Sequence, residues 1–457
     1  MKNVHLLALI WSVVFSPYLV YAQSADQENI RKIFDAALTK GESYEMLEYL
    51  STKIGGRLSG SPQAAAAVEW ARITMEEFAD TVWLQPVMVP HWVRGKQEVA
   101  RILSAKRGAI DVNICALGGS VSTGSHGVTG QVIEVKTFDE LKQLGKAVQG
   151  KIVFFNRPMD PTLINTFSAY SGAVNQRASG ASEAAKLGAI AVVVRSMGSN
   201  LEDYPHTGGV KYQLNVPKIP AVAISTKHAE QLSFILKEEK DLTFFFETHC
   251  ETLPDAPSYN VVGEIKGTEF PDEIIVVSGH LDSWDLGQGA HDDGAGCVQA
   301  MEVLRLFTTL NIKPKRTIRA VMYMNEENGL RGGIEYAKQA EAKNEKHVAA
   351  MESDRGGFTP RGFSSTASDG VKQKLKSWKT LFEPYGVTDF EQEGGGADIG
   401  PLAAQNVPLI GFLPDSQRYF KYHHTIEDTF DKVDKRELEL GAAAMTALTF
   451  MIDQYGL

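Results

Sequence analysis

The stretch SGHLDSWDLGQGAHDDGAGC, residues 278–297, follows an apolar run and places histidine and aspartate among several glycines. Such a run predicts a buried strand, and the glycines allow a sharp turn before the helical pattern that begins near residue 294. In an open parallel sheet, ligands bind outside the carboxyl ends of the strands. The stretch therefore predicts an α/β sheet with a polar site at the end of this strand.

The residue types in this stretch suit a pair of zinc ions. Imidazole nitrogen and carboxylate oxygen are good zinc ligands, and two metals about 3.5 to 4 Å apart need one carboxylate to bridge them. Asp292 and Asp293 are both candidates for the bridge. His280 would bind one metal, and Asp282 would orient its ring from the same side of an extended chain. Each short motif alone is more typical of a strand end or an acidic turn, so other residues must complete the site.

Three further polar clusters also follow β-rich runs, at Asn325–Asn328, Glu352–Asp354 and Tyr422–Thr425. Because the carboxyl ends of parallel strands meet at one edge of a sheet, we expect these clusters to lie together. One metal would take His280, the bridging aspartate and Asp354. The other would take the same aspartate, a glutamate and a late histidine.

The adjacent glutamates Glu326 and Glu327 can do different work. One can bind metal while its neighbour accepts a proton from a water molecule whose pKa zinc has lowered, and we assign Glu326 as the general base and Glu327 as the ligand. The water would attack a carbonyl carbon, and the glutamate would pass the proton to a leaving amine. The residues therefore predict amide hydrolysis.

The motifs GHLDSWDLGQGAHDDGAG, NEENGLRGG, ESDRGG and YHHTIEDT resemble those of the zinc-dependent exopeptidases with a co-catalytic metal pair. Within these they are similar to the plasma glutamate carboxypeptidase (carboxypeptidase Q) branch, over most of the chain. The resemblance implies two Zn²⁺ per chain and the metal ligands His280, Asp292, Glu327, Asp354 and His424. Asp292 would be the bridge.

The resemblance also implies three catalytic residues. Glu326 would be the base, Asp282 would orient His280, and His423 would hydrogen-bond the substrate carbonyl or the tetrahedral intermediate. It further implies a cis peptide between Asp292 and Asp293, and Asp428 as a partner of the late histidine.

The first 22 residues contain Lys2, the apolar run LLALIWSVVF and the small residue Ala22, and predict a secretory signal peptide. A membrane anchor would need about 20 apolar residues without the Ser-Pro found here. We therefore expect a secreted or periplasmic protein, lysosomal or extracellular in a eukaryote, with no membrane span after signal removal. The net charge of −10 argues against nucleic acid as a partner.

The chain of 457 residues exceeds one ordinary core. Glycine-bounded strand candidates between about 120 and 240 resemble the protease-associated domain, a small β-rich insert in which His206 and Asp203 are expected to be loop residues. The catalytic domain would consist of residues 23–119 and 241–457. Helical and strand patterns alternate there, which predicts a mostly parallel central sheet with helices on both faces. The helices are expected at 43–54, 64–79, 294–307, 330–340 and 438–455.

Only three cysteines occur, so the fold cannot rest on a disulfide framework. Cys297 is expected to be a small buried hydrophobe, and pairing of Cys115 with Cys250 stays open.

The leading interpretation is a secreted di-zinc exopeptidase acting on dipeptides and short peptides. An aminopeptidase on the same scaffold is the main alternative, because exopeptidase direction depends on which terminus is recognised. Asp398 could meet an ammonium group and Arg355 a carboxylate, but pairing with a neighbour is favoured for both. A glutaminyl-cyclase-type acyl transferase would use a single zinc, and a non-catalytic protein would lack ligands or base. The oligomeric state stays open, with a homodimer as one option.

Overall fold

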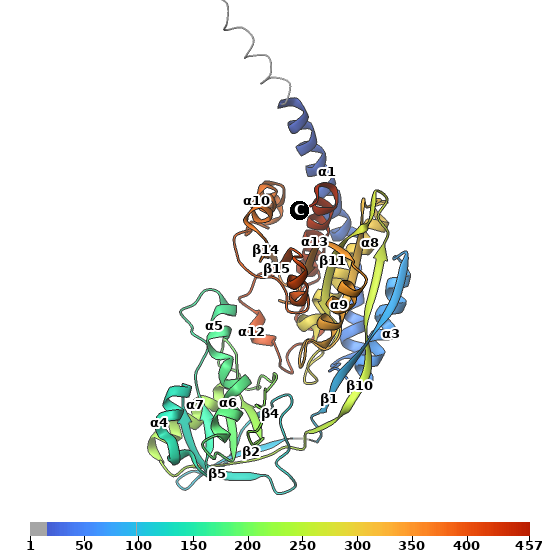
Figure 1. Cartoon of the computed structure of the whole chain (residues 1–457). Helices are drawn as coiled ribbons and strands as arrows, with labels where there is room; N and C mark the ends of the chain where they lie inside the picture. Colours follow the sequence, from blue (N-terminus) through green and yellow to red (C-terminus); the bar gives the residue numbers. More distant parts are fainter. Residues whose placement is uncertain (1–15, 97) are drawn as a thin grey trace, which may run out of the picture.

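The computed structural model describes residues 16–457 apart from residue 97. Most of the predicted signal segment, residues 1–15, therefore lies outside the described residues. The chain forms two sheet-based parts, a catalytic part and an insert, which are joined by a long antiparallel ribbon (Figure 1). Of the helices in residues 16–457, none is long and apolar enough to cross a bilayer.

The central sheet of the catalytic part has seven strands in the order β1-β10-β12-β11-β13-β15-β14. Its four inner strands run parallel, whereas the outer pairings β1–β10, β10–β12 and β14–β15 are antiparallel. The inner strands are β12 (Arg316–Tyr323), β11 (Phe270–His280), β13 (Lys346–Glu352) and β15 (Leu409–Pro414); the outer strands are β1 (Thr81–Val93), β10 (Glu251–Ile265) and β14 (Pro360–Ser365). The inner strands are buried apolar runs, as strands covered on both faces require.

Helices cover both faces of this sheet, as predicted. The larger layer contains α1 (Ser16–Lys40), α2 (Ser43–Tyr49), α3 (Pro62–Glu76), α8 (Ala295–Thr309) and α13 (Lys435–Tyr455). The opposite face is covered by α9 (Arg331–Ala342), whose Tyr336, Ala337 and Ala340 pack on β10, β11 and β12. The five predicted helices are all present. Short helices α10 (Asp369–Ser377), α11 (Lys379–Phe382) and α12 (Tyr419–Tyr422) complete this part.

The insert is built on an eight-stranded sheet in the order β3-β2-β9-β5-β6-β7-β8-β4. Its strands are β2 (Val99–Ser104), β3 (Gly108–Asp111), β4 (Ile114–Ala116), β5 (Val128–Val135), β6 (Ile152–Phe155), β7 (Ala191–Arg195), β8 (Ala221–Ile224) and β9 (Thr243–Glu247). Strands β2 to β4 precede residue 120 and β9 follows residue 240, so the sheet takes in residues on both sides of the predicted insert. Its helices are α4 (Phe138–Leu144), α5 (Thr166–Ala173), α6 (Asn175–Ala185) and α7 (Thr226–Glu238).

The ribbon of β1 and β10 pairs from Thr81 with Glu264 to Val93 with Glu251, and it carries the chain out to the insert and back. The insert then folds back, so that α5 lies near α12 of the catalytic part (Figure 1). This arrangement places insert residues beside the carboxyl edge of the catalytic sheet.

All three cysteines are buried and unpaired. Cys115 and Cys250 therefore form no disulfide in this structure. Cys297 is fully buried, as predicted, and its Sγ donates to the His280 carbonyl oxygen at 3.0 Å.

Candidate metal centre

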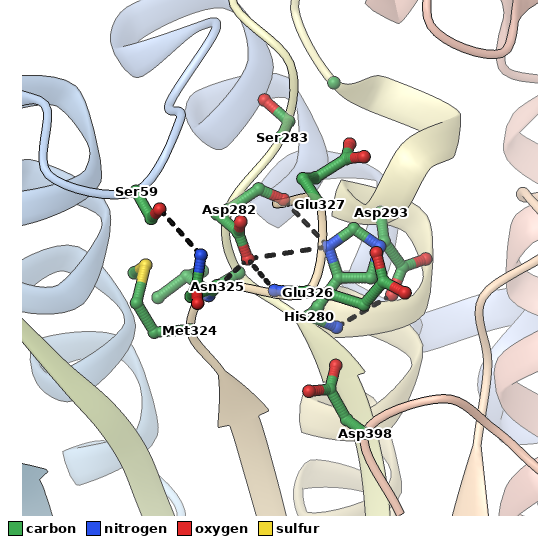
Figure 2. A network of polar contacts seen from close by, with 12 residues as sticks. Ser59, His280, Asp282, Ser283, Asp293, Met324, Asn325, Glu326, Glu327 and Asp398 are labelled. Atoms are coloured by element: carbon green, nitrogen blue, oxygen red, sulfur yellow. Dashed lines mark hydrogen bonds and ion pairs between the residues drawn. The ribbon is translucent and has the colours of Figure 1, made fainter. Parts of the chain in front are cut away.

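The predicted site residues meet at the carboxyl edge of the parallel strands. His280 is the last residue of β11, Glu326 and Glu327 follow β12, and Asp354 follows β13. His423 and His424 directly follow α12. Figure 2 shows His280, at the end of β11, close to Glu326 and Glu327 of the loop that follows β12.

One group of possible metal ligands consists of His280, Asp292 and Asp354. His280 Nε2 lies 3.2 Å from Asp292 Oδ1 and 3.5 Å from Asp354 Oδ1. The three donor atoms thus surround one point that a small cation can occupy.

A second group uses the other oxygen of Asp292, together with His424 and His423. His424 Nε2 lies 3.2 Å from Asp292 Oδ2 and 3.1 Å from Glu327 Oε2. His423 Nε2 is farther from Asp292, at 3.7 Å. Asp292 is common to both groups, which is the geometry that a bridging carboxylate needs.

The peptide between Asp292 and Asp293 is cis, as predicted. Asp293 is not a member of either ligand group. Its carboxylate instead accepts the backbone N–H groups of His280 and Gly296, both at 3.0 Å, and so ties the end of β11 to the start of α8.

The residues fit a cation because their polar atoms and charges are otherwise unsatisfied. His280 Nε2 and Asp292 Oδ2 are buried without a hydrogen-bond partner. Burial raises the pKa of Glu327 well above its usual range, and the nearby Asp292 carboxylate adds to this. Burial opposes charge on His280 too, but the nearby Asp292 and Asp354 carboxylates raise its pKa well above the usual range. Divalent cations would neutralise the negative charge of these closely spaced carboxylates.

Glu326 adjoins the ligand groups without belonging to them. Burial raises the pKa of Glu326 well above its usual range, and the Asp354 and Glu327 carboxylates act in the same direction. A carboxyl group with a raised pKa beside a metal site has the properties of a general base that must hold a proton briefly.

Asp282 supports both His280 and the glutamate loop. Its Oδ1 accepts the N–H groups of Asn325 and Glu326 at 2.7 and 3.0 Å, and lies 3.8 Å from His280 Nδ1 (Figure 2). The nearer partner of His280 Nδ1 is the backbone oxygen of Asp282, at 2.9 Å. Asp282 thus reaches the imidazole mainly through its carbonyl, and its carboxylate holds Asn325 in a left-handed conformation at φ 79°.

The prediction that Asp428 contacts the late histidine is wrong. Its carboxylate accepts the N–H groups of His291 and Asp292, at 2.7 and 3.1 Å. It therefore supports the shared aspartate. His291, which the sequence interpretation passed over, is fully buried and stacks on Phe358, with ring centroids 4.2 Å apart. Burial lowers its pKa to about 3, so it packs there as a neutral ring.

The insert contacts the late histidines directly, which the sequence interpretation missed. His424 Nδ1 lies 3.3 Å from the Thr207 carbonyl oxygen, and the Thr207 N–H donates to the His424 carbonyl at 2.9 Å. His206 lies in a loop, as predicted, but it is buried, and its Nδ1 lies 2.9 Å from the His423 carbonyl oxygen. Arg177 of α6 donates to the Thr207 carbonyl at 3.3 Å.

The two candidates for recognition of a substrate terminus differ from expectation. Asp398 is buried, and both of its carboxylate oxygens lack a hydrogen-bond partner, so the expected pairing with a neighbour is wrong. Figure 2 shows it below His280 on a separate loop. Arg355 lies over the ring of Phe167, 4.4 Å from the centroid, rather than against a carboxylate.

Comparison with known proteins identifies the family of the chain. A family model described as Peptidase family M28 matches residues 260–449, and one described as PA domain matches residues 124–232. The crystal structure of a peptidase M28 precursor from Shewanella amazonensis SB2B superposes with a TM-score of 0.89 and 33% identity, covering 94% of this chain and 97% of that one. The chain therefore belongs to peptidase family M28.

Within the family, the chain is similar to carboxypeptidase Q. The Bos taurus and Homo sapiens proteins are each 36% identical over 414 residues, which cover 90% of this chain and 85% of theirs. A zinc aminopeptidase from Bacillus subtilis shares the fold, with a TM-score of 0.65 and 21% identity over 91% of this chain and 95% of that one. The predicted zinc-dependent exopeptidase with a protease-associated insert is confirmed.

Proposed function

We propose that the protein is a secreted di-zinc exopeptidase that hydrolyses dipeptides and short peptides in the manner its similarity to carboxypeptidase Q suggests. The observation that carries this proposal is the shared position of Asp292 between two ligand groups. A site for one metal would not need an aspartate whose two oxygens face opposite sets of ligands.

We assign His280 and Asp354 to one zinc, Glu327 and His424 to the other, and Asp292 to both. Bound zinc would supply Lewis acidity and would lower the pKa of water at the site. Both histidines keep Nε2 free for this role, because Nδ1 of each lies beside a backbone carbonyl.

Glu326 accepts the proton of the attacking water and later passes it to the leaving amine. Its raised pKa suits this exchange, since a weaker acid takes up a proton more readily at neutral pH. Asp282 keeps Glu326 in position through the backbone N–H that it accepts.

His423 is placed to donate a hydrogen bond to the carbonyl oxygen of the substrate as negative charge develops on it. Its Nδ1 is buried without a partner, and its ring stacks on that of His424 at a centroid distance of 3.5 Å. Burial, and then the neighbouring His424, lower the pKa of His423 well below its usual range, so the ring acts as a neutral donor.

An aminopeptidase is the second candidate, and Asp398 favours it. Its buried carboxylate has no partner and could pair with a substrate ammonium group. A single-zinc acyl transferase would leave one of the two ligand groups without a role. Secretion rests on the apolar segment within residues 1–22, and a homodimer is an option that requires a measurement in solution.

The test is hydrolysis of a free dipeptide by the zinc-loaded protein, with its amino-blocked form and with longer peptides of the same composition. We expect the free dipeptide to be cleaved fastest and long peptides slowly, because the insert lies beside the site and limits access. Rapid stepwise trimming of long peptides from the amino end would support the aminopeptidase instead.

A further inference from the structure

Arg355 directly follows Asp354, one of the candidate metal ligands, and is partly buried. Its guanidinium group lies over the Phe167 ring of the insert. Among the residues that the structure describes, it forms neither an ion pair nor a hydrogen bond. A partly buried cation without an anionic partner suits an anionic ligand, which would balance its charge.

Nearby arginines show how unusual this is. Arg361 pairs with Asp415 at 2.9 Å, and Arg418 pairs with Glu437 at 2.6 Å. Arg355 is therefore a cation whose charge the protein leaves incompletely balanced.

A cleft of about 200 Å³ adjoins Arg355 between the insert and the catalytic part. Asn165 and Phe167 line it from the insert, and Arg361 and Gln417 line it from the opposite side. The two carboxylates in its wall are already engaged: Asp389 accepts the Glu391 N–H and the Gln392 side chain, and Asp415 accepts Arg361 and the Gln417 N–H. The cleft can therefore take an anion beside Arg355.

An aromatic wall connects this cleft to the metal centre. The Phe167 ring stacks on Tyr419 at a centroid distance of 5.2 Å, and Tyr419 lies 5.1 Å from the His423 ring. On the other side, Asp354 lies 3.5 Å from His280 Nε2. Arg355 thus lies next to the reacting centre, with the insert supplying one side of the path.

We propose that Arg355 binds the free carboxylate at the C-terminus of the substrate, and that Phe167 of the insert holds its guanidinium group in place. In a dipeptide the two Cα atoms are about 3.8 Å apart, so the C-terminal carboxylate lies close to the attacked carbonyl. Arg355 directly follows the candidate metal ligand Asp354 and can therefore reach this carboxylate. Guanidinium binds carboxylate through two parallel hydrogen bonds, so the recognition would be directional. The inference rests on the proposed exopeptidase function and specifies which terminus of the substrate the enzyme recognises.

The experiment compares a dipeptide with its C-terminal amide, using zinc-loaded wild type and Arg355→Gln. We expect wild type to favour the free acid by roughly 10- to 100-fold in kcat/KM, the usual range for losing a charge-assisted hydrogen bond. Arg355→Gln should lose activity on the acid by that factor and keep its activity on the amide. Arg355→Lys retains the charge without the bidentate geometry and should keep part of the preference for the free acid.

The control is Arg418→Gln, which changes a nearby arginine that pairs with Glu437 and lies outside the lining of the cleft. It should leave the preference for the acid unchanged. Metal content and melting temperature of each variant confirm that folded, zinc-loaded proteins are compared. Equal cleavage of acid and amide by wild type would overturn the inference, as would a preference that survives Arg355→Gln. Failure of wild type to cleave any dipeptide would contradict the proposed function together with the inference.

Discussion

The two candidate metal-binding histidines are held in the same way but from different parts of the molecule. His280 Nδ1 lies 2.9 Å from the carbonyl of Asp282, two residues along the same loop. His424 Nδ1 lies 3.3 Å from the carbonyl of Thr207, in the insert. We call these the β11 half and the insert-facing half of the site. The β11 half is organised within the catalytic part, whereas the insert-facing half depends on how the insert docks.

The backbone shows the same contrast. His424 adopts a left-handed conformation at φ 63°, which for a residue other than glycine costs of the order of 1 to 3 kcal/mol unless its surroundings hold it. The hydrogen bond from the Thr207 N–H to the His424 carbonyl provides that support. The insert is therefore expected to do more than limit access to the site, because it also holds His424 in position.

Glu326→Gln should have the largest effect on activity. Whatever the two halves of the site contribute, the reaction still needs the proton transfer that Glu326 performs. We expect kcat to fall by roughly 10² to 10⁴, the usual range for loss of a general base, while both metals stay bound. Steady-state kinetics with metal analysis of the same sample would check this. A near-normal rate would remove Glu326 from its assigned role.

Glu327→Gln should separate the two halves. Its Oε2 lies 3.1 Å from His424 Nε2, so the change should weaken metal binding in the insert-facing half and leave His280, Asp292 and Asp354 occupied. Zinc titration should then resolve one tight site and one weakened site. If metal is lost from Glu326→Gln instead, the roles of the two glutamates are reversed.

Arg177→Ala tests whether the insert supports His424. Arg177 donates to the Thr207 carbonyl, and outer partners of a metal ligand commonly change metal affinity by about 10- to 100-fold. We expect a loss of that size at one of the two zinc sites only.

Arg157→Ala is the matched control, because the side chain of this arginine of the same insert donates to Ala173 and Asn175, away from Thr207. It should leave both zinc affinities unchanged. Equal weakening of both sites by Arg177→Ala would mean that the insert stabilises the fold in general and gives no special support to His424.

A smaller effect is expected on the pH dependence of stability, through His347 in the sheet that carries the β11 half. Burial, and then Arg319, lower the pKa of His347 on β13 to about 4 from 6.5, and its Nε2 contacts the Tyr336 hydroxyl at 2.9 Å. As pH falls, His347 therefore takes up a proton in the unfolded chain before it does so in the folded chain. The stability that depends on the neutral ring is present above pH 6.5 and is lost as pH falls towards 4.

His347→Gln should reduce the loss of unfolding free energy between pH 7 and 5 by about 1 to 2 kcal/mol, measured by denaturant titration. His126→Gln, at an exposed position in the insert, should not change this pH dependence. An unchanged pH profile for His347→Gln would show that the buried imidazole is not the source.

Much of the site could be predicted from sequence because its residues follow recognisable strands. The run before His280 and the run before Asn325 both read as buried strands, and the ends of parallel strands must meet. What sequence could not reveal are contacts between segments with no shared pattern. Thr207 and His424 are 217 positions apart, and nothing in the residues around Thr207 indicates a partner.

Asp428 illustrates the same limit at shorter range. An acidic residue near the late histidine suggested a contact with that ring, but the chain turns so that the carboxylate meets the N–H groups of His291 and Asp292. The choice among nearby partners depends on backbone direction, which residue type alone does not determine. The same limit applies to one edge of the central sheet, where the antiparallel pairs β1–β10 and β10–β12 follow from the long ribbon.

The most direct test of the account is the zinc content of the purified, zinc-loaded wild-type protein, measured by elemental analysis together with its activity on a dipeptide. The account predicts two zinc ions per chain at full activity, since Asp292 completes a ligand group on each side. One zinc ion per chain with full activity would contradict it.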